Sequence, residues 1–219
     1  MIATNELIRL IRTAINEIST QNDTFSELVD AALVDFIRLV APLLVMEVPA
    51  AYQTIENKMY IKSTDNCFFK RPDGMYGIKI ALPDNFCRFI SMRSVSWAYP
   101  VTHILPDTDP SFQIQYSTVP GIGTGSSSPL VFLSSELDEG ILKQSIIAHA
   151  IKETEDFTLA FVPKPEVSET EVKLDVRLQE ALALYAAALY LQSIGDAGGS
   201  KAAYDAALNL VKNLNNMSL

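Results

Sequence analysis

Near the N-terminus, hydrophobic residues recur every three or four positions, and this spacing predicts two helices. The residues that follow the period in the first helix are Leu7, Ile8, Ile11, Ala14, Ile15 and Ile18. This helix is expected over residues 4–20, with one apolar stripe facing a core. The second is expected over residues 24–45, because Thr24 and Glu27 form a capping box at its start. Pro42 is expected to kink this helix or to end it.

Between residues 58 and 162 the hydrophobic period shortens toward two, which predicts a β-rich segment. The runs with strand character are residues 59–61, 67–69, 76–80, 88–93, 112–116 and 157–161. Turn sequences that combine Pro with Asp separate several of these runs. Residues 141–151 fit either a strand or a short helix, so the spacing leaves that segment open.

Helical spacing returns in the last quarter of the chain. Ser168 and Glu171 read as a second capping box, which predicts that a helix begins there. Gly195 is placed as the left-handed residue that closes this helix. Asp196 or Ser200 is then expected to cap a last helix that runs toward the C-terminus.

Residues 182–191 are apolar on nearly every side of the predicted helix. Because exposed apolar surface costs about 25 cal/mol per Å², such a helix is stable only when neighbours cover almost its whole circumference. The pattern therefore predicts an α+β fold that is mainly an α-helical four-helix bundle with an inserted β-rich lobe. Residues 1–57 and 166–219 are expected to supply the helices of the bundle, and residues 58–165 the lobe.

Composition and charge narrow the possible partners. With 219 residues, 48% of them hydrophobic and 20% charged, the chain has the composition of an ordinary folded protein. The formal net charge is −9, and the acidic excess is spread along the whole length without a basic segment. Tight binding to phosphate groups is therefore not expected. An acidic surface repels nucleic acid, which suits a wall that DNA must slide past.

Neither cysteine spacing nor hydropathy indicates a secreted or membrane protein. Cys67 and Cys87 cannot build a disulfide scaffold and lack the spacing of a metal site, so they are expected to be buried thiols in a reducing compartment. Residues 1–6 lack the basic and apolar regions of a signal peptide. Charged or polar residues interrupt each apolar run well short of about 18 residues, so we expect synthesis in the cytoplasm and no membrane partner.

Sequence motifs for catalysis are missing. His103 and His149 lie outside any known catalytic or metal-binding motif, so both are expected to be structural. Residues 120–129 are rich in glycine and serine but lack the Lys-Ser/Thr that completes a phosphate-binding loop, and a mobile loop is expected instead. The acidic groups at 107–109 and 136–139 lack the ligand spacing of a calcium loop. We expect no catalytic residue, no cofactor and no metal.

Aromatic residues are the better candidates for an interface, because aromatic rings are enriched where proteins meet. Trp97 and Tyr99 come just after a predicted strand, and packing in the core of the lobe explains them equally well. A pocket lined by Trp97, Tyr99 and Tyr116 would instead bind a small ligand. The candidate interface residues are Trp97, Tyr99, Phe112, Tyr116, Gly121, Gly123 and Gly125.

Two short motifs occur in the β-rich segment, Leu-Pro-x-x-Phe at residues 82–86 and Trp-x-x-Pro at residues 97–100. They are followed by an Ala-rich run that ends in a Gly-Asp turn, at residues 186–196, and by a second Ala-rich run at residues 202–207. In motifs and in layout, the chain resembles phage head-to-tail adaptor proteins. These proteins form the ring beneath the portal in short-tailed phages, including crAss-like phages.

The resemblance implies a structural virion protein at the head–tail junction, assembled in the host cytoplasm. It implies a homo-oligomeric ring, commonly of twelve copies, that binds the portal protein and the next tail protein and continues the DNA channel. DNA would pass through without sequence-specific binding. Some members grip the portal with a C-terminal tail, and here that tail is only residues 213–219. Another tail-ring or head-completion protein, or a small-ligand-binding module that uses the β lobe, are the alternatives.

Overall fold

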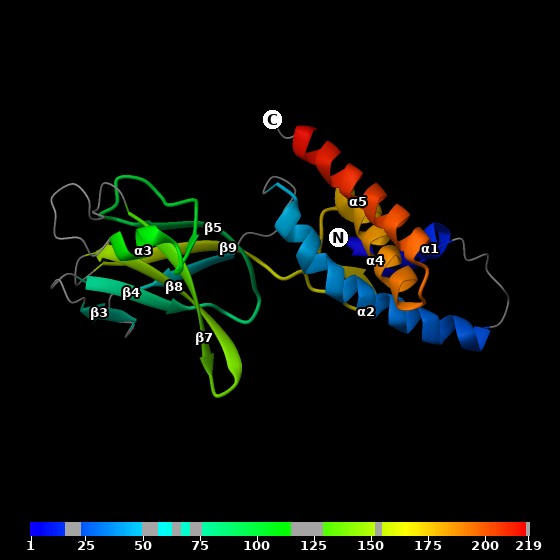
Figure 1. Cartoon of the computed structure of the whole chain (residues 1–219), viewed down its shortest axis with the longest axis horizontal. Coiled ribbons are helices and arrows are strands. Elements are labelled where there is room, and N and C mark those ends of the chain that lie inside the picture. Colours follow the sequence, from blue (N-terminus) through cyan, green and yellow to red (C-terminus); the bar gives the residue numbers. More distant parts are fainter. Residues whose placement is uncertain are drawn as a thin grey trace. The chain divides into compact units, whose positions relative to one another are not determined.

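A computed structural model describes residues 1–15, 23–49, 57–62, 67–70, 76–114, 129–151 and 155–217. The chain divides into two compact units. The helical unit combines Met1–Ile55 with Lys164–Leu219, and the β unit is Glu56–Pro163. Both are drawn in Figure 1, where the colours follow the sequence.

The helical unit is organised around one central helix. It contains α1 (Thr4–Ala14), α2 (Asp23–Glu47), α4 (Gln179–Ser193), α5 (Ala197–Met217) and a 3-10 turn, η2 (Val176–Leu178). A short antiparallel pair, β1 (Ile2–Ala3) with β10 (Glu171–Val172), joins its two chain segments. Helices α1, α2 and α5 all pack against α4. The N-terminal and C-terminal segments are therefore held together chiefly through α4.

The composition of α4 explains its central position. Its buried residues lie on every side of the helix, and they are Ala181, Leu182, Ala183, Tyr185, Ala186, Ala187, Ala188 and Leu191. Alanine side chains are short, so three neighbouring helices can approach the α4 backbone closely. The expectation that neighbours cover almost the whole circumference of this helix is confirmed.

The described residues of the β unit form two sheets that share one core. One sheet has the order β2 (Asn57–Ile61), β9 (Phe157–Pro163), β5 (Phe86–Ser94). The other has the order β3 (Phe68–Lys70), β4 (Tyr76–Ala81), β8 (Ile141–Ile151), β7 (Val131–Asp138), β6 (Leu105–Pro106). Side chains from both sheets form a single buried cluster that includes Ile78, Met92, Val131, Ile146, Phe157 and Leu159.

Strands β7 and β8 form a long hairpin. Glu139 and Gly140 make its two-residue turn, with φ angles of 51° and 81°, the left-handed values that a type I′ hairpin turn requires. Strand β4 pairs with β8 only from Ser145 onward, and β6 pairs with β7 only at Phe132 and Leu133. The Leu82 amide, directly after β4, donates a hydrogen bond to the Gln144 carbonyl. In the part of the chain that the structure describes, residues 135–143 therefore form a two-stranded ribbon, seen extending from the β unit in Figure 1.

The predicted four-helix bundle is wrong, and so is a mainly helical fold. Of the residues described, 44% are helical and 31% lie in strands, so the protein is a mixed α and β structure with a β-rich body. In a four-helix bundle the helices surround a shared core as equals. Here α4 itself occupies the centre of the helical unit, and the other three long helices pack on it. The apolar spacing predicted the helices but not this arrangement.

Some local predictions hold and others do not. Helix α2 passes through Pro42 without ending, because Ala41, Leu44 and Val45 are buried on both sides of the proline. The open segment 141–151 is strand β8. Residues 112–116 were expected to be a strand, but Phe112 lies in the short helix α3 (Pro110–Ile114). Asp109 caps that helix by accepting a hydrogen bond from the Ser111 amide at 2.8 Å.

The two predicted caps near α4 have different outcomes. Ser168 Oγ does accept a hydrogen bond from the Glu171 amide, but the chain then enters β10 rather than a helix. The start of the helical segment is capped by Asp175, whose carboxylate accepts from the Arg177 amide. Gly195 closes α4 with a φ of +84°, and Asp196 caps α5 by accepting from the Gly199 amide, both as predicted.

Candidate functional site

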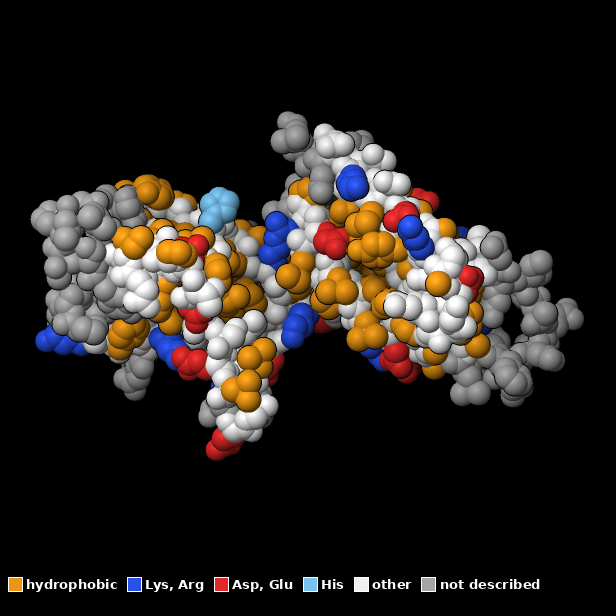
Figure 2. Space-filling model, in the orientation of Figure 1, with side chains coloured by type: hydrophobic (Ala, Val, Ile, Leu, Met, Phe, Trp, Pro, Cys, Tyr) orange, Lys and Arg blue, Asp and Glu red, His pale blue; other side chains and the backbone are white. Residues whose placement is uncertain are grey.

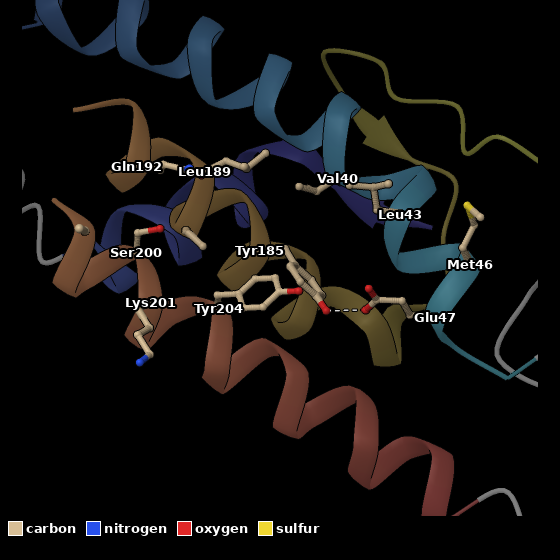
Figure 3. Close-up of a pocket in the computed structure, with 12 residues that line it drawn as sticks. Val40, Leu43, Met46, Glu47, Tyr185, Leu189, Gln192, Ser200, Lys201 and Tyr204 are labelled. Atoms are coloured by element: carbon tan, nitrogen blue, oxygen red, sulfur yellow. Dashed lines mark hydrogen bonds between the residues drawn. The ribbon is translucent and has the colours of Figure 1, made fainter. Parts of the chain in front are cut away.

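A groove of about 680 Å³ lies in the helical unit, with α2 on one side, α5 on the other and α4 as its floor (Figure 3). We call it the α2–α5 groove. It is lined by Val40, Leu43, Met46, Glu47, Tyr185, Ala188, Leu189, Gln192, Ala197, Ser200, Lys201 and Tyr204. Small side chains such as Ala188, Ala197 and Ser200 leave room above α4, which is why a depression exists here.

The α2 side of the groove exposes large apolar side chains. Leu43 is 57% exposed and Met46 is 59% exposed. Leu39 continues this stripe one turn earlier, while Leu33, Ile37 and Leu44 bury the other face of α2. A helix that is apolar on both faces is usually covered by protein on both sides. The outer face of α2 therefore has the character of a contact surface.

The floor of the groove holds a polar contact between α4 and α2. Tyr185 on α4 is almost fully buried and donates its hydroxyl to Glu47 Oε2 at 2.5 Å (Figure 3). The ring of Tyr204 on α5 packs edge-on against Tyr185, with 5.5 Å between centroids. Burial raises the pKa of Tyr185, and the hydrogen bond to Glu47 raises that pKa further. The phenol therefore stays protonated and acts as a donor, not as a base.

Polar groups flank the apolar lining. Figure 3 shows Gln192, Ser200 and Lys201 toward one end of the groove, while Met46 and Glu47 lie toward the other. Lys201 is exposed, so its ammonium group is available to an anion that approaches from solvent. Apolar walls with few polar groups are suited to binding an apolar partner in a fixed orientation.

A second apolar feature lies at the end of the β7–β8 hairpin, residues 135–143. Leu137 and Leu142 face each other across the two strands and are 77% and 61% exposed. Acidic residues surround them, and Glu136 forms an ion pair with Lys79 at 2.7 Å. Figure 2 shows hydrophobic side chains along this hairpin and acidic ones at its end. Exposed leucines at the end of a projecting ribbon are a second candidate contact surface.

The residues predicted for an interface lie in different surroundings. Trp97 is only 3% exposed, and its ring packs edge-on against Phe157. It therefore lies in the core of the β unit, which was the alternative to an interface position in the sequence analysis. Tyr99 is exposed. Phe112 is half-buried on α3 and packs edge-on against Phe132 in β7. The other four predicted residues lie outside the described residues, and they are Tyr116, Gly121, Gly123 and Gly125.

Sequence reasoning missed the α2–α5 groove. The available signal was in residues 33–46, where apolar residues occupy both faces of one helix.

The same reasoning also missed a polar cluster inside the β unit. There the buried Glu155 accepts hydrogen bonds from Ser94 Oγ and Ser96 Oγ, each at 2.6 Å. Among the described residues, Glu155 Oε1 and the Trp97 indole nitrogen are buried and have no hydrogen-bond partner. This cluster joins β5 to the start of β9.

Within the described ranges, no three side chains of His, Cys, Asp or Glu come together in a group that could hold a metal ion. No helix among the same residues is long and apolar enough to span a membrane. His103 is exposed, and Cys67 and Cys87 are half-buried cysteines that form no disulfide. The side chain of His149 lies outside the described part.

No protein-family model matches this chain. No curated protein matches it either. A function must therefore be argued from the groove, the hairpin and the motifs of the chain itself.

Proposed function

We propose that this protein is a structural subunit of a phage head–tail connector, which assembles with copies of itself into a ring between the portal and the tail. The observation that carries the proposal is the α2–α5 groove. Its exposed wall, formed by Leu43 and Met46, has the apolar character of a surface that another protein covers.

Two further features support an assembly role. The hairpin end exposes Leu137 and Leu142, so each unit of the chain presents an apolar surface to solvent. The dense packing around α4 makes the helical unit a rigid block, which suits a subunit that must stack side by side with its copies. The motifs at residues 82–86 and 97–100 resemble those of phage head-to-tail adaptor proteins, and this resemblance supplies the virion setting of the proposal.

The charge of the chain also fits this role. A net charge of −9 disfavours binding to the phosphates of packaged DNA. A ring whose lumen is acidic would let DNA slide past during ejection without holding it. The portal protein and the next tail protein are the neighbours that this position would require.

A second candidate function rests on the size of the groove. Its volume of about 680 Å³ falls within the range of small-molecule sites, which is about 300–1,000 Å³. A ligand-binding protein would be a monomer whose melting temperature rises when the ligand is added. A connector subunit would instead form a complex of higher mass with its own copies or with the portal protein.

The test is to measure the mass of the full-length protein alone and mixed with the portal protein of its own phage. Sedimentation velocity gives the mass in solution, and negative-stain microscopy of the mixture shows whether a ring stacks on the portal. We expect a ring of defined copy number, alone or on the portal. A protein that stays monomeric at high concentration and does not bind the portal would refute the connector proposal.

A further inference from the structure

We propose that the end of the β7–β8 hairpin of one copy docks in the α2–α5 groove of a second copy. Leu137 and Leu142 would then lie between α2 and α5 of the receiving subunit. This inference rests on the proposed function, because it names the contact through which copies of the chain join. The occupant of the groove is thus a second copy of this chain.

The end of the β7–β8 hairpin is narrow enough to enter a groove on another subunit. Residues 135–143 form a ribbon of two strands, and in the described part of the chain no third strand pairs with its edges. Near the β unit, Leu137 also lines a shallow pocket with Phe68 and Ala81. Directly opposed side chains in such a ribbon have Cβ atoms about 4.5–5.5 Å apart. Leu137 and Leu142 are opposed in this way and both are largely exposed. Together they present one compact apolar projection.

The groove has the matching features. Ala188 and Ala197 line it with side chains no larger than a methyl group, so a projecting leucine meets open space there. Leu43 and Leu189 provide apolar walls, and Met46 is a flexible side chain that adapts to the shape of a partner. The groove therefore accepts branched aliphatic side chains without a rearrangement of the backbone.

Charge favours the same pairing. Three of the four residues at positions 136–139 are acidic, and Glu136 is already paired with Lys79. Glu139, at the turn, is exposed. The groove offers Lys201 toward one end, with the amide of Gln192 and the hydroxyl of Ser200 nearby, and the carboxylate of Glu47 lies toward the other end. Two chains of net charge −9 repel each other, so a local cation beside the groove helps to orient an acidic insert.

The projection and the groove are different surfaces of the same chain. A contact between them is head-to-tail, so each copy that receives a hairpin still offers its own hairpin to the next copy. Such contacts close into a ring when the rotation per subunit closes, and otherwise grow into a filament. A two-fold contact between identical surfaces would stop at a dimer. The proposal therefore predicts assembly beyond two copies.

The test uses two variants of the full-length chain. In the first, Leu137→Ser and Leu142→Ser remove the projection and leave the groove intact. In the second, Leu43→Glu places a charge in the groove and leaves the projection intact. Each variant alone is expected to associate at least about tenfold more weakly than the natural protein, a factor that corresponds to about 1.4 kcal/mol. Mixed together, they are expected to form a one-to-one complex that grows no further.

Two matched controls accompany these variants. Val95→Ser changes an exposed apolar residue of the β unit away from the hairpin, and Val176→Ser does the same in the helical unit away from the groove. Both are expected to assemble like the natural protein. Circular dichroism melts of all variants test whether each is folded. Should Leu43→Glu fail to fold, Lys201→Glu replaces it, and its weaker assembly is expected to be restored in a mixture with Glu139→Lys.

The outcomes separate this inference from the function on which it rests. If the natural protein forms rings, alone or on the portal, and the hairpin and groove variants do so equally well, another surface joins the copies and the inference is wrong while the connector proposal stands. If the natural protein neither self-associates nor binds the portal, the connector proposal itself fails. A one-to-one complex in the mixture, with each variant monomeric alone, supports both.

Discussion

The hydroxyl of Tyr185 donates a hydrogen bond to the carboxylate of Glu47, across 138 residues of sequence. This contact fixes the C-terminal end of α2 against the middle of α4. No basic residue lies in the last turn of α2, so Tyr185 supplies the donor that steadies a carboxylate at the negative end of the helix dipole. The wall and the floor of the α2–α5 groove are thereby held in one relative position.

Replacing Tyr185 with Phe removes this hydrogen bond and keeps the ring. We expect the free energy of unfolding to fall by about 0.5–1.5 kcal/mol, because Glu47 is exposed and water can replace the lost donor. Urea denaturation followed by circular dichroism measures the change. Tyr60→Phe, at an exposed tyrosine of the β unit, is the matched control and is expected to leave stability unchanged. Equal effects of the two changes would mean that the contact contributes nothing.

The raised pKa of Tyr185 also predicts a dependence of stability on pH. Burial raises this pKa above the value of about 10 that a tyrosine has in the unfolded chain. The folded state therefore keeps its proton when the unfolded state has lost it. The stability that the raised pKa of Tyr185 contributes is fully present below a pH of about 10 and is lost as the pH rises further. We expect the stability of the natural protein to fall more steeply above this pH than that of Tyr185→Phe, and parallel curves would contradict the assignment.

The cluster at Glu155 is expected to be sensitive to the loss of one hydroxyl. Ser94→Ala removes one of the two serine donors to Glu155 Oε2, and the carboxylate stays buried. A buried polar group that loses a hydrogen-bond partner costs about 1–3 kcal/mol. Thermal melting in the absence and presence of urea measures the loss. Ser135→Ala, at an exposed serine of β7, is the control, and a melting temperature of Ser94→Ala equal to that of this control would rule out a stabilising role for the cluster.

Helix α4 is expected to tolerate no enlargement of its alanines. Ala187 is fully buried between neighbouring helices, so Ala187→Leu inserts three carbon atoms into a packed interior. We expect destabilisation by about 1–3 kcal/mol through overpacking. Ala202→Leu, at an exposed position on α5, is expected to change stability by less than about 0.5 kcal/mol. Chemical denaturation of both variants checks the prediction, and a neutral Ala187→Leu would show that α4 is not centrally packed.

Features decided by a few neighbouring residues could be predicted from sequence. Gly195 takes its left-handed conformation and Asp196 caps α5 because both depend only on adjacent backbone groups. Asp109 followed by Pro110 is a similar local signal, a capping residue before a proline at the first helical position, and reading it would have predicted α3 in place of a strand. By contrast, the hydrogen bonds around Ser168 form in a turn before a strand as readily as before a helix.

The sequence by itself determined where most helices and strands form, and that α4 must be covered on nearly every side. Which elements cover it was decided only by the tertiary structure, because apolar spacing states how much surface must be buried and not against what. For the same reason the spacing alone did not distinguish Leu44, which is buried, from Leu43, which is exposed in the groove. The pairing of Tyr185 with Glu47 and the assembly of the Glu155 cluster likewise depend on contacts between residues far apart in the chain. Local interactions carry no information about such contacts.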